Sequence, residues 1–225
     1  MAVIHHLDDA TSLANAALAA SCAFDGVFVI HMKGQDTVID APAVAIKRAF
    51  PELLVGTNRL ATHPGAALRR DVELGLDATW CDNPGVYSHS VEPLALSIAD
   101  ELKSIRENRP EHLYFGSVAF KTQGEDPDPP AAGVAAAGLG WIATTSGVAT
   151  GSAPDASKLR DMKAALGDRP LAVASGVSPD NIAELGPHLD WILVATGISR
   201  DFHHFDPDRM TRLAAGVREL QRAST

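Results

Sequence analysis

The chain has 225 residues, of which 46% are hydrophobic and 21% are charged. This length and composition exclude a disordered chain and predict a single domain over residues 1–225 with a core of its own. Acidic residues exceed basic ones by 28 to 19, giving a formal charge of -9. Such a surface repels polyanions, so we expect no nucleic-acid partner.

The chain shows no signal for export or membrane insertion. Cys22 and Cys81 are too few for a disulfide framework and lack metal-motif spacing, which indicates a reducing compartment. Residues 1–9 have no basic stretch of the signal-peptide kind, and no apolar run approaches membrane-spanning length. The sequence therefore predicts a cytoplasmic protein without a membrane partner.

Short apolar runs rich in β-branched and aromatic residues alternate with helical stretches along the whole chain. The predicted strands are 3–7, 27–31, 53–58, 78–81, 113–120, 141–145, 171–175 and 191–196. The helical stretches lie at about 11–23, 44–48, 66–74, 93–105, 130–137, 157–166, 179–185 and 207–222.

Strict strand–helix alternation predicts a parallel sheet, because parallel neighbours need a crossover connection. Eight such units in this length favour an α/β fold of the single (β/α)8 TIM-barrel kind. An open doubly wound sheet is the alternative, but no G-x-G-x-x-G motif follows the first strand. Residues 123–130, rich in proline and acid, predict a mobile active-site loop after the fifth strand.

In a barrel, the residues at the C-terminal ends of the strands form the active site. Several polar side chains occupy such positions, and we interpret them as catalytic candidates. They are His5, Asp8, His31, Asn58, Asp82 and Lys121.

Three strand ends carry glycine next to hydroxyl residues, at 145–151, 174–178 and 195–199. Glycine lets consecutive backbone N–H groups converge on an anion, and the loops after the last two strands of a barrel frequently bind phosphate. The alternative is that these glycines only serve tight turns. The predicted phosphate-binding residues are Thr145, Gly147, Gly151, Ser175, Gly176, Thr196, Gly197 and Ser199.

Lys121 ends an otherwise apolar strand. It has three readings, namely a ligand-binding cation, a Schiff-base amine, or a rim lysine whose stem packs while its ammonium reaches water. The sequence does not choose among them.

The histidines at positions 5, 6 and 31 raise acid–base and metal hypotheses. Neighbouring strand residues face opposite sides, so only one of His5 and His6 points into the barrel. No H-x-H or H-E-x-x-H spacing is present, so we predict no metal and favour acid–base use of a histidine with Asp8 or Asp9. His203 and His204 are expected to be solvated, and Cys81 to be a small buried residue.

Several segments together resemble the BtpA/SgcQ family of TIM-barrel proteins, among the phosphate-binding barrels. The likeness spans nearly the whole chain, through 24–27, 56–60, Lys121, 145–151, 175–181, 195–199 and 206–209. The resemblance implies the barrel and the phosphate site; one member of the family is linked to photosystem I biogenesis. The chain departs from the family at 6–9, 61–63 and Arg200, all near the expected catalytic rim.

The leading hypothesis is an enzyme acting on a small phosphorylated metabolite, a sugar phosphate or nucleotide-like compound, by isomerase, epimerase or lyase chemistry without a cofactor. Glycosyl or phosphoribosyl transfer is a further option, although no pyrophosphate loop is recognisable. A non-catalytic BtpA-like assembly or regulatory factor is the alternative from another class, and a metal-dependent hydrolase is the third. The exposed barrel ends leave room for a homo-oligomer.

Overall fold

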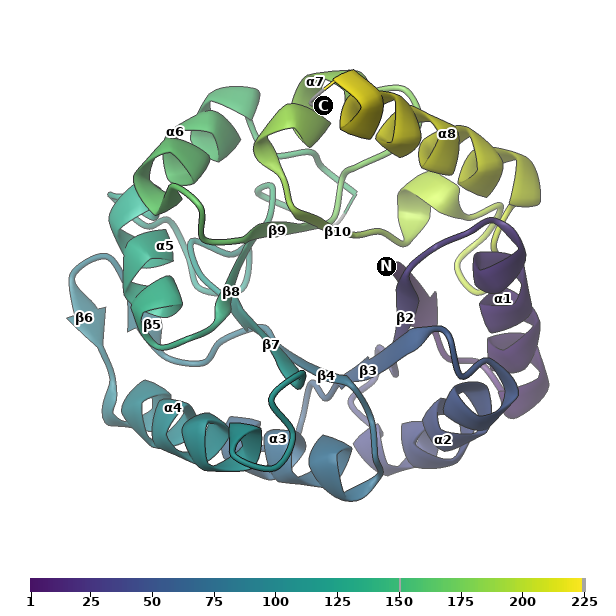
Figure 1. Ribbon diagram of the computed structural model, residues 1–225, viewed down its shortest axis with the longest axis horizontal. Coiled ribbons are helices and arrows are strands. Elements are labelled where there is room, and N and C mark those ends of the chain that lie inside the picture. The colour runs from purple at the N-terminus through teal and green to yellow at the C-terminus, as the bar shows by residue number, and fades with distance from the viewer. Residues whose placement is uncertain (150, 224–225) are drawn as a thin grey trace.

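A ring of eight parallel strands forms the centre of the molecule in the computed structural model, which describes residues 1–149 and 151–223. In spatial order the strands are β1 (Ala2–His5), β2 (Gly26–Ile30), β3 (Leu54–Asn58), β4 (Ala78–Cys81), β7 (Leu113–Ser117), β8 (Ile142–Thr145), β9 (Leu171–Ala174) and β10 (Trp191–Leu193). The Val3 amide donates to the Val194 carbonyl at 2.8 Å and joins the last strand to the first (Figure 1). The expected (β/α)8 barrel is confirmed.

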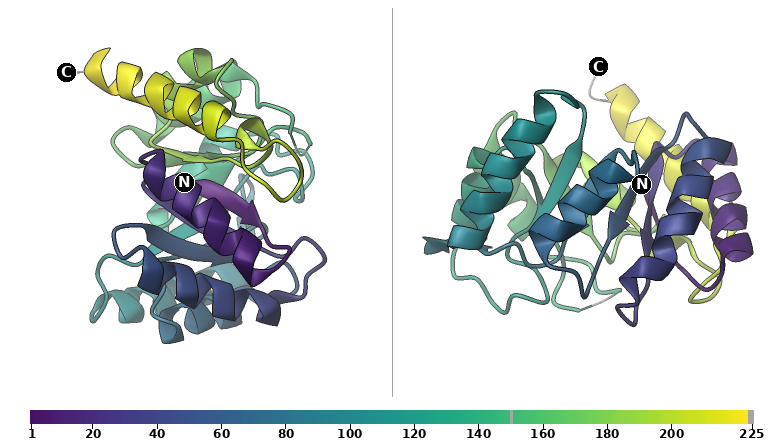
Figure 2. Two further views of the ribbon diagram at one scale, coloured as in Figure 1. Left: turned by 90° about the vertical axis from the view of Figure 1, so that its right-hand side faces the viewer. Right: turned by 90° about the horizontal axis from the view of Figure 1, so that it is seen from below.

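Eight α-helices surround this ring (Figure 1). They are α1 (Asp9–Ser21), α2 (Asp40–Ala49), α3 (Pro64–Glu73), α4 (Pro93–Arg106), α5 (Pro129–Gly138), α6 (Ala156–Leu166), α7 (Ile182–Leu185) and α8 (Pro207–Ala223). Three short 3-10 turns, η1 (Asp36–Ile39), η2 (Gly186–His188) and η3 (Thr196–Ile198), lie in the connections. The side view shows α8 extending past the end of the barrel at which the strands begin (Figure 2).

Local chemistry explains where several helices begin. The carboxylates of Asp8, Asp128 and Asp155 each accept a backbone N–H of the following first turn, which satisfies donors that a helix leaves unpaired. Proline occupies the first turn of α3 and α4, where no N–H is needed.

The core has two layers because alternate strand residues face opposite sides of the sheet. Between sheet and helices, aliphatic side chains dominate. Inside the barrel, the rings of Phe28, Trp80 and Phe115 meet edge to face, with Phe28 5.7 Å from Trp80 and 5.2 Å from Phe115 between centroids. The interior is therefore filled, and any ligand has to sit above it, where the strands end.

Three of the differences between the predicted elements and the structure lie in the connections near the mouth. The fifth barrel strand ends at Ser117, short of position 120, because Ala119 adopts a positive φ of 45° that breaks the extended backbone. Helix α7 covers only Ile182–Leu185 because the Asn181 side chain pairs with the amide of Ser178 and closes a turn first.

The third difference is a hairpin, β5 (Val86–Tyr87) and β6 (Ser90–Val91), in the connection after β4. It holds the proline-rich loop predicted to be mobile. Asp126 of that loop accepts the Ser88 amide at 2.9 Å, and Gln123 donates to the carbonyls of Val86 and Ser117.

Candidate functional site

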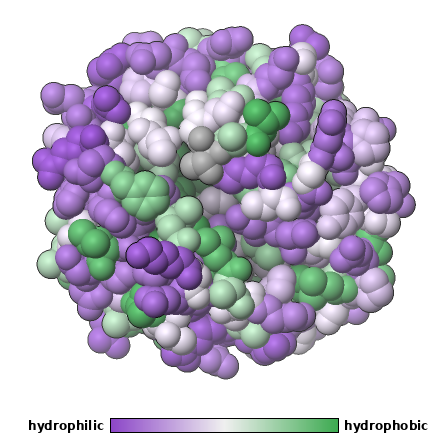
Figure 3. Space-filling view, turned by 180° about the vertical axis from the view of Figure 1, so that it is seen from behind, coloured by the Kyte–Doolittle hydropathy of each residue, from purple (hydrophilic) through white to green (hydrophobic). Residues whose placement is uncertain are grey.

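The polar side chains predicted for the mouth lie at the ends of strands whose successive residues face the barrel interior and the outer helices in turn. Val3, Phe28 and Trp80 lie in the barrel interior. His5 and Asp82 are two residues further along β1 and β4, so they face the same interior side, one layer nearer the mouth. Figure 3 looks onto this face, where the strands end.

The floor of the mouth is aromatic. Phe120 is 1% exposed and its ring lies 6.3 Å from that of Trp80. The Trp80 indole donates to the Ser117 hydroxyl at 3.1 Å, so its one polar group is satisfied inside the barrel. Because this floor excludes water, the local dielectric constant is low, and electrostatic interactions between charges placed above it are stronger than in water.

Asn58, Asp82 and Lys121 gather above the floor from three neighbouring strand ends. The Asn58 amide donates to the Asp82 carboxylate at 2.8 Å. Burial raises the pKa of Asp82, while Asn58 and Lys121 oppose that rise. Burial likewise lowers the pKa of Lys121, and Asp82 opposes that change. Burial thus shifts both pKa values toward the uncharged forms, and each group opposes the shift of the other.

The ammonium of Lys121 is not locked in an ion pair. Its Nζ lies 5.2 Å from the centroid of the Phe120 ring, and it donates to no oxygen of the described residues, 1–149 and 151–223. The backbone of Lys121 is held, because its amide donates to Ser146 Oγ at 3.0 Å. A fixed backbone with an unused ammonium is the arrangement expected of a ligand-binding lysine.

His5 is a buried, neutral imidazole at the opposite side of the mouth. Its Nδ1 lies 3.1 Å from the Phe202 carbonyl, which can only accept, so Nδ1 carries the proton and Nε2 has a free lone pair. Burial is the main cause that lowers the pKa of His5, and the positive charge of Lys121 adds to it. His5 therefore has the protonation state of a general base at neutral pH.

His6 faces the other way, toward α1, where its Nδ1 pairs with Ser12 Oγ at 2.9 Å. The expectation that only one of these two histidines points inward is confirmed. His203 is not simply solvated: it is half-buried and its Nδ1 pairs with the His5 carbonyl at 2.9 Å. His204 pairs with Asp201.

Two predicted catalytic residues serve local structure. Asp8 is exposed and caps α1 by accepting the Thr11 amide at 2.7 Å, which lowers the pKa of Asp8. His31 accepts the Gln35 amide at its Nδ1, 3.1 Å away, and so fixes the turn after β2. We leave both out of the proposed site.

The three glycine-bearing turns after β8, β9 and β10 touch one another through their backbones. A Cβ added to Gly176 would fall on the main chain of Ala153, and one added to Gly197 would fall on the Val177 carbonyl. A Cβ on Gly151 would lie 3.7 Å from Thr196 Oγ1. At Gly176 and Gly197 only glycine permits the close approach, whereas the distance at Gly151 is an ordinary contact. Together the three turns bring the last three strand ends into contact.

Four amides in these turns have no acceptor. Within the described part of the chain, the N–H groups of Gly176, Val177, Thr196 and Gly197 donate to no oxygen. Ser175 precedes them with a positive φ of 99°, and its hydroxyl is buried without a partner. A serine in the left-handed region costs free energy, and such strain clusters at binding sites.

The remaining predicted phosphate residues have other roles. Thr145 is fully buried and donates to the Ala119 carbonyl at 3.1 Å, so its hydroxyl does not reach the mouth. Ser199 donates to the Ala195 carbonyl at 2.8 Å. A Cβ on Gly147 would fall on the Ser152 carbonyl, so Gly147 serves close packing. Thr150 of the same turn lies outside the described residues.

One contributor, Lys158, was missed by sequence reasoning, and Cys81 is the buried residue that was expected. Lys158 of α6 donates to the carbonyls of Ala119 and Ser146 and so holds the ends of β7 and β8 together. Burial raises the pKa of Cys81 to about 12, so this residue is a thiol and not a nucleophilic thiolate. No pattern in the sequence marks the Lys158 contacts, because they join a helix to the ends of two strands.

Arg59, the residue after Asn58 at the end of β3, points to the outside of the barrel. It is 7% exposed and pairs with Asp71 at 2.9 Å and Asp40 at 2.8 Å. Because adjacent strand residues face opposite sides, this anchor fixes the end of β3 and leaves Asn58 directed inward. Among the described residues, no group of three or more histidine, cysteine, aspartate or glutamate side chains could hold a metal ion.

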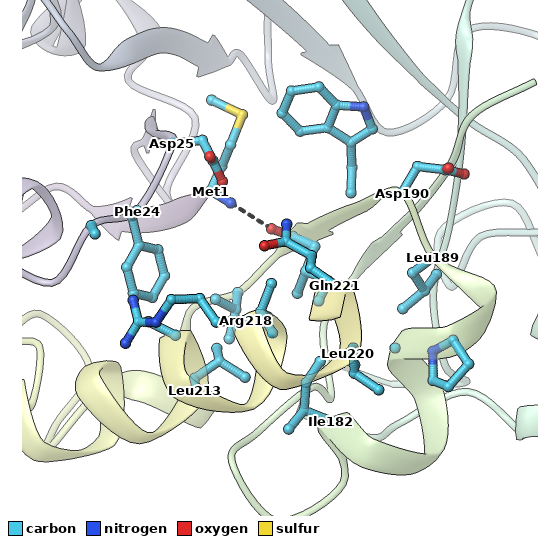
Figure 4. Close-up of a pocket in the computed structure, with 18 of the residues that line it drawn as sticks. Met1, Phe24, Asp25, Ile182, Leu189, Asp190, Leu213, Arg218, Leu220 and Gln221 are labelled. Atoms are coloured by element: carbon cyan, nitrogen blue, oxygen red, sulfur yellow. Dashed lines mark hydrogen bonds between the residues drawn. The ribbon is translucent and has the colours of Figure 1, made fainter. Parts of the chain in front are cut away.

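The opposite face carries a separate cavity of about 690 Å³, beneath the overhanging end of α8 (Figure 4). Its walls are mainly apolar, with Phe24, Leu213 and Val217 among them. Asp190 at its edge is already engaged by Lys163 at 2.8 Å. The acid–base groups all lie at the other face, which is where barrel enzymes carry out their chemistry.

Comparison with known proteins agrees with the architecture. No family model matches the chain, and no characterised protein matches it by sequence. Phosphoribosyl anthranilate isomerase from Thermus thermophilus has 15% identity and a TM-score of 0.67, with 97% of this chain and 98% of that chain covered. The chain is a TIM barrel.

Two further solved structures show the same likeness. Thiamine phosphate pyrophosphorylase from Pyrococcus furiosus is 13% identical, with 97% and 95% covered and a TM-score of 0.65. A phosphoribosyl anthranilate isomerase in complex with reduced 1-(o-carboxyphenylamino)-1-deoxyribulose 5-phosphate is 14% identical, with 97% of both chains covered and a TM-score of 0.65. At these identities the likeness shows the fold alone. The BtpA/SgcQ resemblance stays a prediction. No helix within 1–149 or 151–223 is long and apolar enough to cross a bilayer.

Proposed function

We propose that this TIM barrel is an enzyme that isomerises or cleaves a small phosphorylated metabolite. The observation that carries the proposal is the contact between the turns after β9 and β10, where amides without acceptors surround Gly176 and Gly197. Converging N–H groups favour a dianion such as a phosphate monoester. The similar structures named for phosphorylated compounds support this choice of ligand.

The phosphate would be held by these amides together with the Ser175 hydroxyl. That hydroxyl is buried and unpartnered, so a ligand oxygen would remove the cost of leaving it unpaired. The rest of the substrate would extend over the aromatic floor toward Asp82 and Lys121. No cofactor is required for the chemistry that follows.

In this proposal, His5 and Asp82 exchange protons with the substrate. The free Nε2 of His5 takes a proton from a hydroxyl-bearing carbon next to a carbonyl group, while Asp82 in its protonated form, which burial favours, donates its proton to the carbonyl oxygen. The Lys121 ammonium stabilises negative charge on that oxygen. The protonated His5 then gives its proton to the former carbonyl carbon, while the Asp82 carboxylate takes the proton of the hydroxyl group on the first carbon, which becomes the new carbonyl. This gives the isomer and restores both side chains.

Phosphate binding is tested first, by 31P NMR titration with inorganic phosphate. We expect Ser175→Ala to weaken binding and Gly197→Ala to abolish it, because a Cβ there pushes the two turns apart. Gly138→Ala is the matched control, since nothing lies within 4 Å of its added Cβ. Unchanged binding in Gly197→Ala would place the anion elsewhere.

Chemistry is tested by solvent deuterium incorporation into a panel of ketose and aldose phosphates. His5→Gln and Lys121→Met should lose exchange while they retain phosphate binding. Borohydride trapping of wild-type protein with a ketose phosphate separates a Schiff-base lysine, which gives a covalent adduct, from a binding lysine, which gives none.

The other two functions predict different results. A wild-type protein that binds phosphate but exchanges no proton with any panel member would favour the non-catalytic, BtpA-like factor. Stoichiometric zinc or manganese in elemental analysis, with hydrolysis of a panel member, would favour a metal-dependent hydrolase.

A further inference from the structure

Large apolar side chains are exposed almost entirely around the mouth of the barrel. Eight such residues are at least 37% exposed in the described chain, and all lie in a connection that follows a strand or in the first turn of the helix after it. They are Leu7, Met32, Val38, Leu60, Val91, Leu96, Val148 and Phe202. Isolated exposed apolar residues are ordinary, but confinement to one face is not.

Four of them form a continuous series around the ring. Phe202 follows β10, Leu7 follows β1, Met32 follows β2 and Leu60 follows β3, and these four strands are neighbours in that order. We call these four residues the apolar crescent. The view onto this face shows green side chains in several separate places between the centre and the rim, among mainly purple ones (Figure 3).

The crescent continues directly into the proposed site. The Phe202 ring, 52% exposed, lies 4.4 Å from the His5 ring between centroids, and the Phe202 carbonyl accepts from His5. One face of the proposed general base is therefore bordered by an aromatic side chain that is open to solvent.

The two connections that come next after the crescent carry polar side chains at the mouth. Asp82 and Asn83 follow β4, and Lys121 and Thr122 follow β7. The mouth thus has unpaired amides after β9 and β10, Asp82 and Lys121 after β4 and β7, and the apolar crescent after β10 and β1 to β3, with His5 of β1 beside Phe202.

We propose that the substrate carries an aromatic or branched aliphatic group besides its phosphate, and that this group packs on the apolar crescent. The inference rests on the proposed function, because the phosphate fixes one end of the molecule. A small sugar phosphate without such a group would leave the crescent in water, whereas burying it contributes binding free energy in proportion to area. Phe202 would also discriminate among substrates by the group next to the reacting carbon.

The test compares inorganic phosphate, methyl phosphate and phenyl phosphate by 31P NMR and calorimetric titration. We expect phenyl phosphate to bind wild-type protein about tenfold more tightly than methyl phosphate, equivalent to about 1.4 kcal/mol. Phe202→Ala should remove that preference and leave methyl phosphate binding unchanged. Leu96→Ala is the matched control, because Leu96 is 50% exposed but lies on the outer helix α4.

The outcomes separate the two proposals. Equal binding of phenyl and methyl phosphate would overturn this inference and leave the proposed function standing. Failure of all three phosphates to bind would remove the proposed function itself. A preference for phenyl phosphate that Phe202→Ala and Leu96→Ala reduce equally, or that both retain, would also overturn the inference, and circular dichroism of each variant checks that the fold is retained.

Discussion

Replacing His112 tests how strongly burial controls titration in this barrel. His112 is 1% exposed, and its Nε2 lies 3.2 Å from Thr79 Oγ1. Burial, with a smaller contribution from the nearby Arg109 charge, lowers the pKa of His112 from 6.5 to about 4. Below pH 6.5 the unfolded chain binds a proton that the folded protein does not, so folding stability is lost as the pH falls toward 4.

The magnitude follows from the size of that shift. One pKa unit corresponds to about 1.4 kcal/mol. The contribution of His112 to the unfolding free energy therefore falls by about 3 kcal/mol over the full range from pH 6.5 to 4, and by about 2 kcal/mol between pH 7 and 5. Asp71 acts in the opposite sense. Burial raises its pKa to about 6, so its contribution to stability falls as the pH rises from 4 to 6. Subtracting the unfolding free energy of a His112 variant from that of the wild type at each pH removes the contribution of Asp71, which both proteins share.

The assay is urea denaturation of wild-type protein and His112→Gln at pH 7, 6 and 5. We expect the difference in unfolding free energy, wild type minus variant, to shrink by about 2 kcal/mol from pH 7 to pH 5. A constant difference over that range would mean that His112 titrates alike in the folded and unfolded states, and the reasoning from burial would be refuted. The imidazole NMR signal of the folded protein provides a direct second measurement.

Three further substitutions have definite expected results. Asp82→Asn should lower the pKa of Lys121 further, since the carboxylate opposes the effect of burial; 13C NMR of reductively methylated protein checks this. Gly176→Ala should destabilise the fold by at least 1 kcal/mol more than Gly75→Ala in urea. The two glycines have φ of 77° and 75°, but only the first would bring its Cβ onto another backbone. Asp71→Leu should cost about 3–5 kcal/mol in the same assay, because it leaves a buried guanidinium short of one carboxylate.

The barrel could be predicted because its signal repeats. Each of eight β-branched or aromatic runs was followed by a helical stretch, and errors in single boundaries did not alter the alternation. The hairpin formed by Val86–Tyr87 and Ser90–Val91 was missed because strands of two residues have no measurable periodicity. The early end of β7 was missed because an alanine in the sequence does not predict a positive φ. In the structure, Lys158 and Thr145 both donate to the Ala119 carbonyl and hold this residue in place.

The candidate site was predictable only in part. Topology places the ends of parallel strands at one face, which is why Asn58, Asp82 and Lys121 could be grouped before the contacts between them were known. Roles that depend on orientation could not be read in advance. Asp8 looks catalytic in the sequence and turns out to cap a helix, because a single backbone amide lies within reach of its carboxylate.

The surroundings of His5 come from the far end of the polypeptide. Phe202 covers its ring and His203 holds its carbonyl, about two hundred positions later in the chain. During synthesis, an emerging chain can therefore make the first seven strands and still lack the environment that keeps this imidazole neutral. A proteolytic cut between β10 and α8 would release the same contacts in the finished protein, so loss of the proposed activity should precede loss of the barrel during limited digestion.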